Sequence, residues 1–279
     1  MNIMTFDVEE WWHFDVYSTE DKWAHYKPRI ELYLPLVLDK LEEKGVKASF
    51  FCLGWIARTY PDIIKRISAR GHEIACHTDM HLFVKDMRPE FFREDLHRAL
   101  DSIENVTGAK VKSFRAPAFT ITENVKWAFE VLAEQGIEYD CSIFPTSRSY
   151  GGFPSFGEGK PTLINYKGNT IKEFPINSGK LLGKYFVFSG GGYFRLFPYW
   201  LIKHLLKQSD YAITYLHMRD FDFDQPRFNY FNVERTFKSY YGLKNAYSKF
   251  LKLMNDFQWV NIEQADKMID WNNVRKIDL

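Results

Sequence analysis

The chain has 279 residues, a length that fits one large domain or two small ones. Hydrophobic residues make up 46% of it and charged residues 26%, a balance that excludes the disordered and collagen-like classes. A formal net charge of +1 argues against binding driven by bulk charge, so we expect no nucleic-acid partner.

The first residues carry neither a basic segment nor a long apolar run, so no signal peptide is expected. The apolar segment "LYLPLVL" (residues 32–38) is too short to cross a bilayer and contains a proline. Three cysteines, Cys52, Cys76 and Cys141, include no CxxC pair, which is not typical of a disulfide framework or a structural zinc site. We therefore expect a cytoplasmic protein without a transmembrane segment, with the inner face of the membrane as the alternative location.

Short apolar runs alternate with helical patterns through the first half of the chain. The expected strands are residues 2–6, 46–54, 72–76, 110–114 and 137–142. The expected helices between them are residues 31–44, 61–70, 89–105 and 122–136, with proline at two starts, Thr122 as a possible N-cap and glycine at three ends. Such alternation predicts a parallel sheet.

The second half is less regular. It contains strand-like segments at 162–166, 170–176, 211–217 and 258–262, and helices that begin at Pro198 and cover 236–256. Seven or so alternating units predict an α/β fold of the distorted (β/α) barrel type, with about seven parallel strands. We expect residues 1–279 to form a single domain with an irregular insertion around 145–198.

Five of the predicted strands have residues of catalytic types at or near their carboxyl ends. They are Asp7 and Glu9, His77 and His81, Arg115, Asp140, and His217. In (β/α) barrels, catalytic groups come from the carboxyl ends of several strands. These residues therefore predict an active site at that end of the sheet.

The segment "CHTDMH" places His77 and His81 four residues apart. On a helical turn this spacing puts two imidazoles on one face. Two imidazoles and one carboxylate leave open positions on a divalent metal, as hydrolysis requires. Surface or capping histidines are the alternative for this motif by itself, and Asp79 is interpreted as a loop or capping residue.

The segment "DVEEWWHFD" supplies Asp7 and Glu9, which share one face if the strand continues. One can then bind the metal while the other acts as a base. Glu10 would point away toward solvent. His13 is either packed or exposed, or else a further ligand or substrate contact.

Two further strand ends suggest supporting roles. Arg115 can hold a catalytic carboxylate through a two-pronged hydrogen bond, although a structural ion pair is the alternative. His217, at the end of "YAITYLH", is a plausible general acid. "SGGG" (residues 189–192) is expected to form a tight loop, with the lining of a substrate groove as its alternative.

Four motifs in order, "TFDVEE", "HTDMH", "RAPAF" and "YLH", resemble those of the polysaccharide deacetylases, carbohydrate esterase family four. "DVEEWWHF", "YDCSIFP" and "GGGYFRLFPYW" further resemble a subset associated with exopolysaccharide and O-antigen synthesis. The resemblance implies a distorted (β/α) barrel and metal-dependent removal of N-acetyl, less often O-acetyl, groups from sugars.

The resemblance also implies roles for individual residues. Asp7 matches the catalytic base and Arg115 the arginine that orients it, while His217 matches the general acid. Glu9, His77 and His81 match the ligands of a zinc-like divalent ion, with Glu9 in place of the family's aspartate. The Ala118 N–H would serve the oxyanion, and Asp140 is favoured over Glu173 and Asp220 as the acid that supports His217.

The implied partner is an acetylated sugar, carried by a polysaccharide, a lipid-linked glycan or a nucleotide sugar. Two alternatives remain open: a barrel glycoside hydrolase with two carboxylates, and an inactive carbohydrate-binding protein. A two-histidine iron oxygenase fits the ligands but not the alternation of strands and helices.

Overall fold

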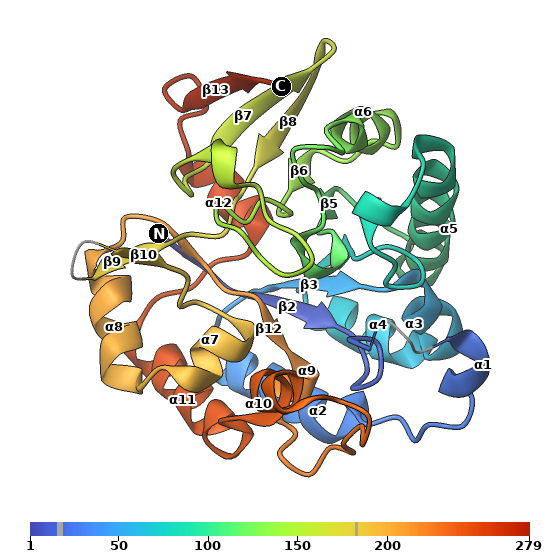
Figure 1. Ribbon diagram of the computed structural model, residues 1–279, viewed down its shortest axis with the longest axis vertical. Coiled ribbons are helices and arrows are strands. Elements are labelled where there is room, and N and C mark those ends of the chain that lie inside the picture. The colour runs from blue at the N-terminus through green and yellow to red at the C-terminus, as the bar shows by residue number, and fades with distance from the viewer. Residues whose placement is uncertain (16–18, 182–183) are drawn as a thin grey trace.

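The computed structural model describes residues 1–15, 19–181 and 184–279. It has an α/β fold in which a twisted sheet carries helices along its outer side (Figure 1). The sheet has nine strands, in the order β12 (Leu216–His217), β2 (Thr5–Val8), β3 (Ser49–Cys52), β4 (Glu73–Cys76), β5 (Ser113–Phe114), β6 (Tyr139–Asp140), β8 (Asn169–Glu173), β7 (Thr162–Tyr166) and β13 (Arg275–Asp278).

Seven of these strands, from β12 to β8, run parallel to one another. The predicted α/β class with about seven parallel strands is therefore confirmed. β7 pairs antiparallel with β8 as a hairpin, and β13 adds to its outer edge. Within the described residues no ladder joins β12 to the far end of the sheet, so the strands do not close into a regular barrel.

In the first half of the chain, the helices predicted at 31–44, 61–70 and 89–105 form close to their predicted bounds, and two short helices were not predicted. The helices of this half are α1 (Glu20–Trp23), α2 (Ile30–Glu43), α3 (Gly54–Thr59), α4 (Pro61–Ala69), α5 (Pro89–Thr107) and α6 (Trp127–Glu134). Proline begins α4 and α5, where its missing N–H costs no intrahelical hydrogen bond. α6 starts later than its expected N-cap at Thr122, because residues 122–126 form a turn instead.

The second half differs more from expectation. Its helices are α7 (Gly191–Leu196), α8 (Tyr199–Gln208), α9 (Met218–Phe221), α10 (Val233–Tyr240), α11 (Leu243–Asp256) and α12 (Ile262–Met268). The single helix expected over 236–256 is wrong, because Gly242 has φ +76° and separates α10 from α11. Residues 258–262 form no strand; Val260 makes only an isolated bridge to Ile3.

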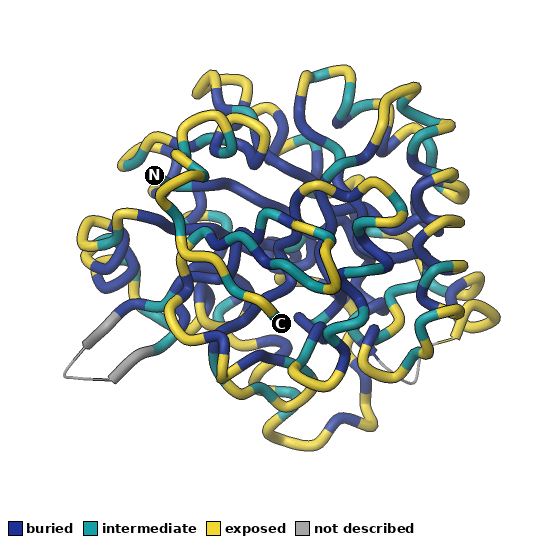
Figure 2. Tube along the Cα trace, turned by 90° about the horizontal axis from the view of Figure 1, so that it is seen from above, coloured by how far each residue is buried: buried dark blue, intermediate teal, exposed yellow. Residues whose placement is uncertain are grey.

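The N-terminal strand is split in two, and so is its neighbour. β1 (Asn2–Ile3) pairs with β11 (Ala212–Ile213), whereas β2 pairs with β12. At the break between them the Thr214 hydroxyl accepts a hydrogen bond from the Thr5 N–H, 2.8 Å away. Residues far apart in sequence thus lie side by side, and the strands they flank are buried (Figure 2).

Three short 3-10 turns complete the connections, at Val84–Asp86, Pro117–Phe119 and Pro154–Phe156. A second hairpin joins β9 (Gly179–Leu181) to β10 (Lys184–Phe186). None of the helices in the described ranges combines the length and apolar character needed to cross a bilayer.

Candidate active site and metal centre

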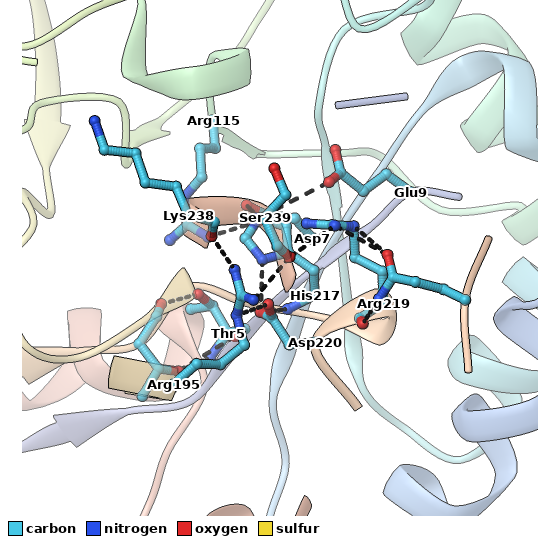
Figure 3. A network of polar contacts seen from close by, with 12 residues as sticks. Thr5, Asp7, Glu9, Arg115, Arg195, His217, Arg219, Asp220, Lys238 and Ser239 are labelled. Atoms are coloured by element: carbon cyan, nitrogen blue, oxygen red, sulfur yellow. Dashed lines mark hydrogen bonds and ion pairs between the residues drawn. The ribbon is translucent and has the colours of Figure 1, made fainter. Parts of the chain in front are cut away.

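The predicted site residues lie at the carboxyl ends of neighbouring strands. Asp7 on β2 is the direct register partner of His217 on β12. His217 Nε2 is 3.5 Å from Asp7 Oδ2 and 3.9 Å from Glu9 Oε1. Figure 3 shows these three side chains together with Arg115, which approaches from the end of β5. The structure thus brings residues from opposite ends of the chain into one cluster.

Glu9, His77 and His81 form a group suited to a metal ion. One ligand atom from each lies within 4.8 Å of the other two. Glu9 Oε2 is 2.6 Å from His81 Nε2, and the two imidazole rings are 5.2 Å apart between centroids. All three side chains are almost fully buried, so their convergence is not a chance surface contact.

The orientation of His77 fits metal binding. Its Nδ1 lies 2.7 Å from the Arg115 carbonyl oxygen, which can only accept a hydrogen bond. Nδ1 therefore carries the proton, and Nε2 keeps the lone pair that a metal needs. Burial lowers the pKa of His77 to about 4, so this imidazole is neutral at physiological pH.

The two histidines do not lie on a helical turn, so that part of the prediction is wrong. Residues 77–83 form an irregular turn in which Thr78 has φ +69° and His81 φ +57°. Left-handed backbone at two non-glycine residues is strained, and it turns His81 toward Glu9. Asp79 anchors the turn through a two-pronged ion pair with Arg58.

Glu9 also carries the negative charge that a metal-binding carboxylate needs. Burial alone would raise its pKa, but the charge and hydrogen bond of His81 outweigh burial and hold the pKa well below the usual range. Glu9 Oε2 is buried, and among the described residues its polar contact is with His81 Nε2. A buried carboxylate oxygen beside two imidazole nitrogens is the donor set of a divalent cation, so these residues fit one.

Arg115 holds Asp7 in place. Its Nη1 donates to Asp7 Oδ1 at 2.7 Å, and both side chains are buried. The guanidinium lies 4.0 Å above the Phe51 ring, which fixes it from the other side. Because one oxygen of Asp7 is taken by Arg115, the other oxygen, Oδ2, is the one that faces His217.

We expected Asp140 to support His217, but Asp220 is the carboxylate that contacts it. Asp220 Oδ2 accepts from His217 Nδ1 at 2.9 Å and from the His217 backbone N–H at 3.0 Å. Burial would lower the pKa of His217, but Asp220 outweighs it and raises the pKa to about 9. His217 is therefore a protonated acid at neutral pH, with Nε2 directed at the cluster.

Arg195 completes this support from α7. Its Nε lies 2.9 Å from Asp220 Oδ1, and it also donates to carbonyl oxygens at the end of α10 (Figure 3). Burial would raise the pKa of Asp220, yet His217 and Arg195 lower it to about 2. The three-residue spacing from His217 to Asp220 is that of a helix N-cap and its N3 residue, a signal that could have identified this pair.

Asp140 lies elsewhere in the interior. Ser142 Oγ donates to Asp140 Oδ1 at 2.5 Å and accepts from the Ala116 N–H at 2.8 Å. Burial and the neighbouring Asp140 raise the pKa of Glu173 well above its usual range, which favours the protonated form of this carboxyl. In the described residues Asp140 has no contact with His217 and instead supports the loop that follows β5.

Ala118 lies in that loop with φ +51°, and Phe119 follows with φ +57°. Two successive non-glycine residues in the left-handed region are uncommon and costly, and such strain gathers at functional sites. The N–H groups of Phe119 and Thr120 donate to Ala116 and Pro117, whereas that of Ala118 donates to no group in the described part of the chain. The Ala118 N–H is therefore available to a ligand.

The rest of the acidic opening segment is structural. Glu10 was expected in solvent, but it is buried and accepts from the N–H groups of Arg29, at 2.8 Å, and Ile30, at 3.1 Å. It thereby satisfies free donors at the start of α2. Trp11 and Trp12 pack edge to face in the core.

His13 is packed as well. Its Nδ1 accepts from the Glu10 N–H at 2.9 Å, and its ring lies edge-on to Trp23, 4.4 Å away, and Trp55, 5.3 Å away. Because Nδ1 accepts, the proton of the neutral ring is on Nε2, which removes the lone pair that a metal would use.

Two family models match consecutive parts of the chain. Residues 15–139 match "Polysaccharide deacetylase", and residues 141–267 match a domain of unknown function (DUF3473). The first match contains His77, His81 and Arg115, whereas His217, Asp220 and Arg195 lie in the second. The site therefore draws on both matched regions.

Curated relatives align with parts of the chain. A peptidoglycan-N-acetylglucosamine deacetylase of Bacillus cereus is 36% identical over 99 residues, which cover 35% of this chain and 36% of that protein. A chitooligosaccharide deacetylase of Sinorhizobium fredii is 46% identical over 50 residues, 18% of this chain and 23% of that protein. The chain thus spans about a third or less of these relatives' length.

Solved structures are similar over the whole chain. One, of a Mycobacterium smegmatis protein assigned to the polysaccharide deacetylases, has a TM-score of 0.67 at 18% identity and covers 100% of this chain and 92% of that one. A carbohydrate esterase family four pseudoenzyme of Bacillus anthracis has a TM-score of 0.51 at 15% identity, covering 100% and 69%. At these identities the similarity is one of fold.

Proposed function

The chain belongs to the polysaccharide deacetylase family, carbohydrate esterase family four, and on this basis we propose that it is a metal-dependent hydrolase that removes acetyl groups, chiefly N-acetyl, from a sugar. One observation carries the proposal. The buried group of Glu9, His77 and His81 lies directly beside the Asp7–Arg115 pair and beside His217. Metal-assisted hydrolysis of an amide needs these three parts at one place.

The metal site is assigned to Glu9, His77 and His81, and the ion to Zn²⁺, because two imidazoles and one carboxylate are a common catalytic zinc set. Such an ion supplies Lewis acidity to the acetyl carbonyl and lowers the pKa of a bound water. The extra methylene of Glu9 relative to aspartate lets its carboxylate reach His81 Nε2, 2.6 Å away.

The chain's own residues perform the proton transfers. Asp7 Oδ2, free of Arg115, accepts a proton from the attacking water. His217, protonated on Nε2 and held by Asp220, donates a proton to the departing amine. The Ala118 N–H donates to the oxyanion of the tetrahedral intermediate, a contribution typically worth about 3 kcal/mol.

The substrate proposed is an acetylated amino sugar in a polysaccharide, a lipid-linked glycan or a nucleotide sugar. The relatives named above act on peptidoglycan N-acetylglucosamine or chitooligosaccharides. A role in exopolysaccharide or O-antigen synthesis is proposed with it. A cytoplasmic setting is proposed because Cys52, Cys76 and Cys141 are all free thiols.

We also propose that residues 1–279 act as one catalytic domain. Asp7 and His217 are partners on adjacent strands, although His217 lies in the second matched region and Asp7 precedes both. The glycoside hydrolase alternative leaves the two histidines and Arg115 without a role. The observed pairing of each with a neighbouring site residue therefore favours deacetylation over that alternative.

The decisive experiment measures acetate release from chitooligosaccharides and peptidoglycan fragments. We expect release by the protein as purified, loss with a chelator, and recovery when Zn²⁺ is returned. The Asp7→Asn variant should bind the metal normally yet lose about 10²- to 10⁴-fold in kcat, because the general base is gone. Full activity of Asp7→Asn would disprove the assignment of the base, and reducing-end release without acetate would favour a glycoside hydrolase.

A further inference from the structure

Arg148 is a cation near the active site. It lies in the loop between β6 and β7, and its guanidinium carbon is 4.4 Å from the centre of the Phe144 ring and 5.1 Å from that of Phe119. Its Nη1 is buried, and no residue in the described part of the chain accepts a hydrogen bond from it. In the described ranges, no carboxylate forms an ion pair with it.

Tyr215 is the second unsatisfied group of this cluster. Its side chain is 3% exposed, and its hydroxyl has no hydrogen-bond partner among the described residues. Its ring lies edge-on to Phe119, with 5.0 Å between centroids. It is also 6.3 Å from the Phe144 ring, so Tyr215 and Arg148 pack against the same two aromatic rings.

This cluster borders the proposed catalytic residues. The Tyr215 ring is 6.3 Å from the His217 ring. A Cβ on Gly191 would lie 2.9 Å from the Tyr215 ring and 3.8 Å from His217 Cε1. The backbone at Gly191 therefore packs closely against both side chains. A Cβ on Gly151 would lie 2.7 Å from the Ala118 carbonyl oxygen. The loop that carries Arg148 therefore packs onto the loop that offers the Ala118 N–H.

The other arginines of the site have fixed roles. Arg115 is paired with Asp7, and Arg195 with Asp220. Arg148 has neither a carboxylate nor a carbonyl on its buried nitrogen, although leaving a buried charged donor unsatisfied is costly. Contact with two aromatic rings offsets only part of that cost, since a cation–π contact contributes about 0.5–2 kcal/mol. An oxyanion on a ligand would satisfy both Arg148 and the Tyr215 hydroxyl.

We propose that Arg148 and Tyr215 form a subsite for an anionic group of the sugar substrate, a carboxylate or a phosphate, beside the acetyl group that is removed. This inference rests on the proposed deacetylase function and narrows its substrate class to acidic glycans or phosphate-linked sugars. The planar guanidinium donates two parallel N–H groups to such an oxyanion, and the tyrosine hydroxyl adds a third donor.

Three substrates distinguish the possible anions. They are a neutral N-acetylglucosamine oligomer, an oligomer of the same length that alternates N-acetylglucosamine with glucuronate, and UDP-N-acetylglucosamine. We expect the wild-type protein to prefer one of the two anionic substrates in kcat/KM. A preference for the glucuronate oligomer identifies a carboxylate, and a preference for the nucleotide sugar identifies a phosphate.

Variants then test the residues. Arg148→Gln should lower kcat/KM on the preferred anionic substrate by about 10- to 100-fold, as loss of a charge-assisted hydrogen bond does, and leave the neutral oligomer within about 3-fold. Arg148→Lys should recover part of the loss, because it keeps the charge but not the fork. Tyr215→Phe should lower the same kcat/KM by about 2- to 10-fold. Arg93→Gln, on the exposed face of α5, is the matched control.

Equal losses on neutral and anionic substrates would overturn the subsite, even in an active enzyme. If no substrate releases acetate, the deacetylase proposal fails, and binding decides the subsite separately. Binding is measured by calorimetric titration of two ligands, the glucuronate oligomer and UDP-N-acetylglucosamine. Each is titrated into the wild-type protein and into Arg148→Gln, after the two proteins have been shown to have equal metal content and equal thermal stability. At least tenfold weaker binding of one ligand to the variant supports the subsite, and equal binding of both overturns it.

Discussion

At the scale of single residues, three side chains of the site each use one polar atom to bind a neighbouring protein group and keep a second polar atom free. His77 uses Nδ1 on the Arg115 carbonyl, Asp7 uses Oδ1 on the Arg115 side chain, and His217 uses Nδ1 on Asp220. In each case the remaining nitrogen or oxygen faces the cluster. Such second partners fix the tautomer and the orientation of a catalytic group, so the first prediction concerns one of them.

Asp220→Asn should move the alkaline limb of the pH–rate profile to lower pH. His217 must be protonated to act as the acid, and Asp220 is the main cause that raises its pKa to about 9. Without that charge the pKa falls toward the ordinary value, so activity is lost at a pH about one to two units lower. The measurement is kcat against pH for acetate release.

Asp86→Asn is the control for this shift, because Asp86 is an exposed aspartate whose ion pair is with Lys85. Asp140→Asn tests the alternative support for His217 and should leave the alkaline limb where it is, whatever it does to stability. An unmoved limb in Asp220→Asn, or a moved one in Asp140→Asn, would contradict the pairing seen here.

At the scale of elements, α7, which precedes β12, and α10, which follows it, hold the proposed acid His217 in place. Arg195 on α7 joins Asp220 to the carbonyl oxygens of Lys238 and Ser239 at the end of α10. Gly242 follows that end with φ +76°, and a Cβ there would lie 2.5 Å from the Arg195 carbonyl oxygen. The break between α10 and α11 is therefore what allows α7 to approach.

Gly242→Ala should destabilise the protein more than the same substitution does at a left-handed glycine with free space around it. Backbone strain contributes about 1 kcal/mol, and the contact with Arg195 should bring the total to about 3 kcal/mol. Gly136→Ala is the matched control, since its φ is +81° but nothing lies within 4 Å of a Cβ. Urea unfolding measures both, and equal losses would show that the approach of α7 carries no strain.

At the scale of the whole molecule, the site joins the first strand of the chain to the strand at residue 216. Parallel β2 and β12 place Asp7 beside His217, and the proposed metal ligands are Glu9, just after β2, and His77 and His81, after β4. An ion bound there links segments that have no covalent connection nearby. A ligand that binds only the folded state at 100 times its Kd adds about 2.7 kcal/mol to stability.

Removal of the metal by a chelator should therefore lower the melting temperature by about 5–10 °C, and Zn²⁺ should restore it. Glu9→Gln should abolish this metal-dependent shift, because the carboxylate that remains charged in the buried site is lost. Glu90→Gln is the control, because Glu90 is an exposed residue on α5. Scanning calorimetry with metal analysis gives the answer, and a shift that persists in Glu9→Gln would place the ion elsewhere.

Much of this architecture is already determined by local sequence. Alternating apolar runs and capped helices predict the parallel α/β order, because strand and helix periods, Pro61 and Pro89 act over a few residues. The rule that side chains at strand ends share one edge brings Asp7, His77, Arg115 and His217 together. These inferences need no knowledge of distant contacts.

Only the tertiary structure decided the finer roles. Asp220, and not Asp140, supports His217, because the direction of the chain after β12 turns Asp220 back onto the ring while Asp140 turns inward to Ser142. Glu10 is buried because α2 begins against it. His81 reaches Glu9 through left-handed backbone and not through helical spacing. The burial of Glu10 and the contact of His81 with Glu9 depend on contacts between distant segments, which local periodicity does not encode. The pairing of His217 with Asp220 is local and has the spacing of a helix N-cap and its N3 residue.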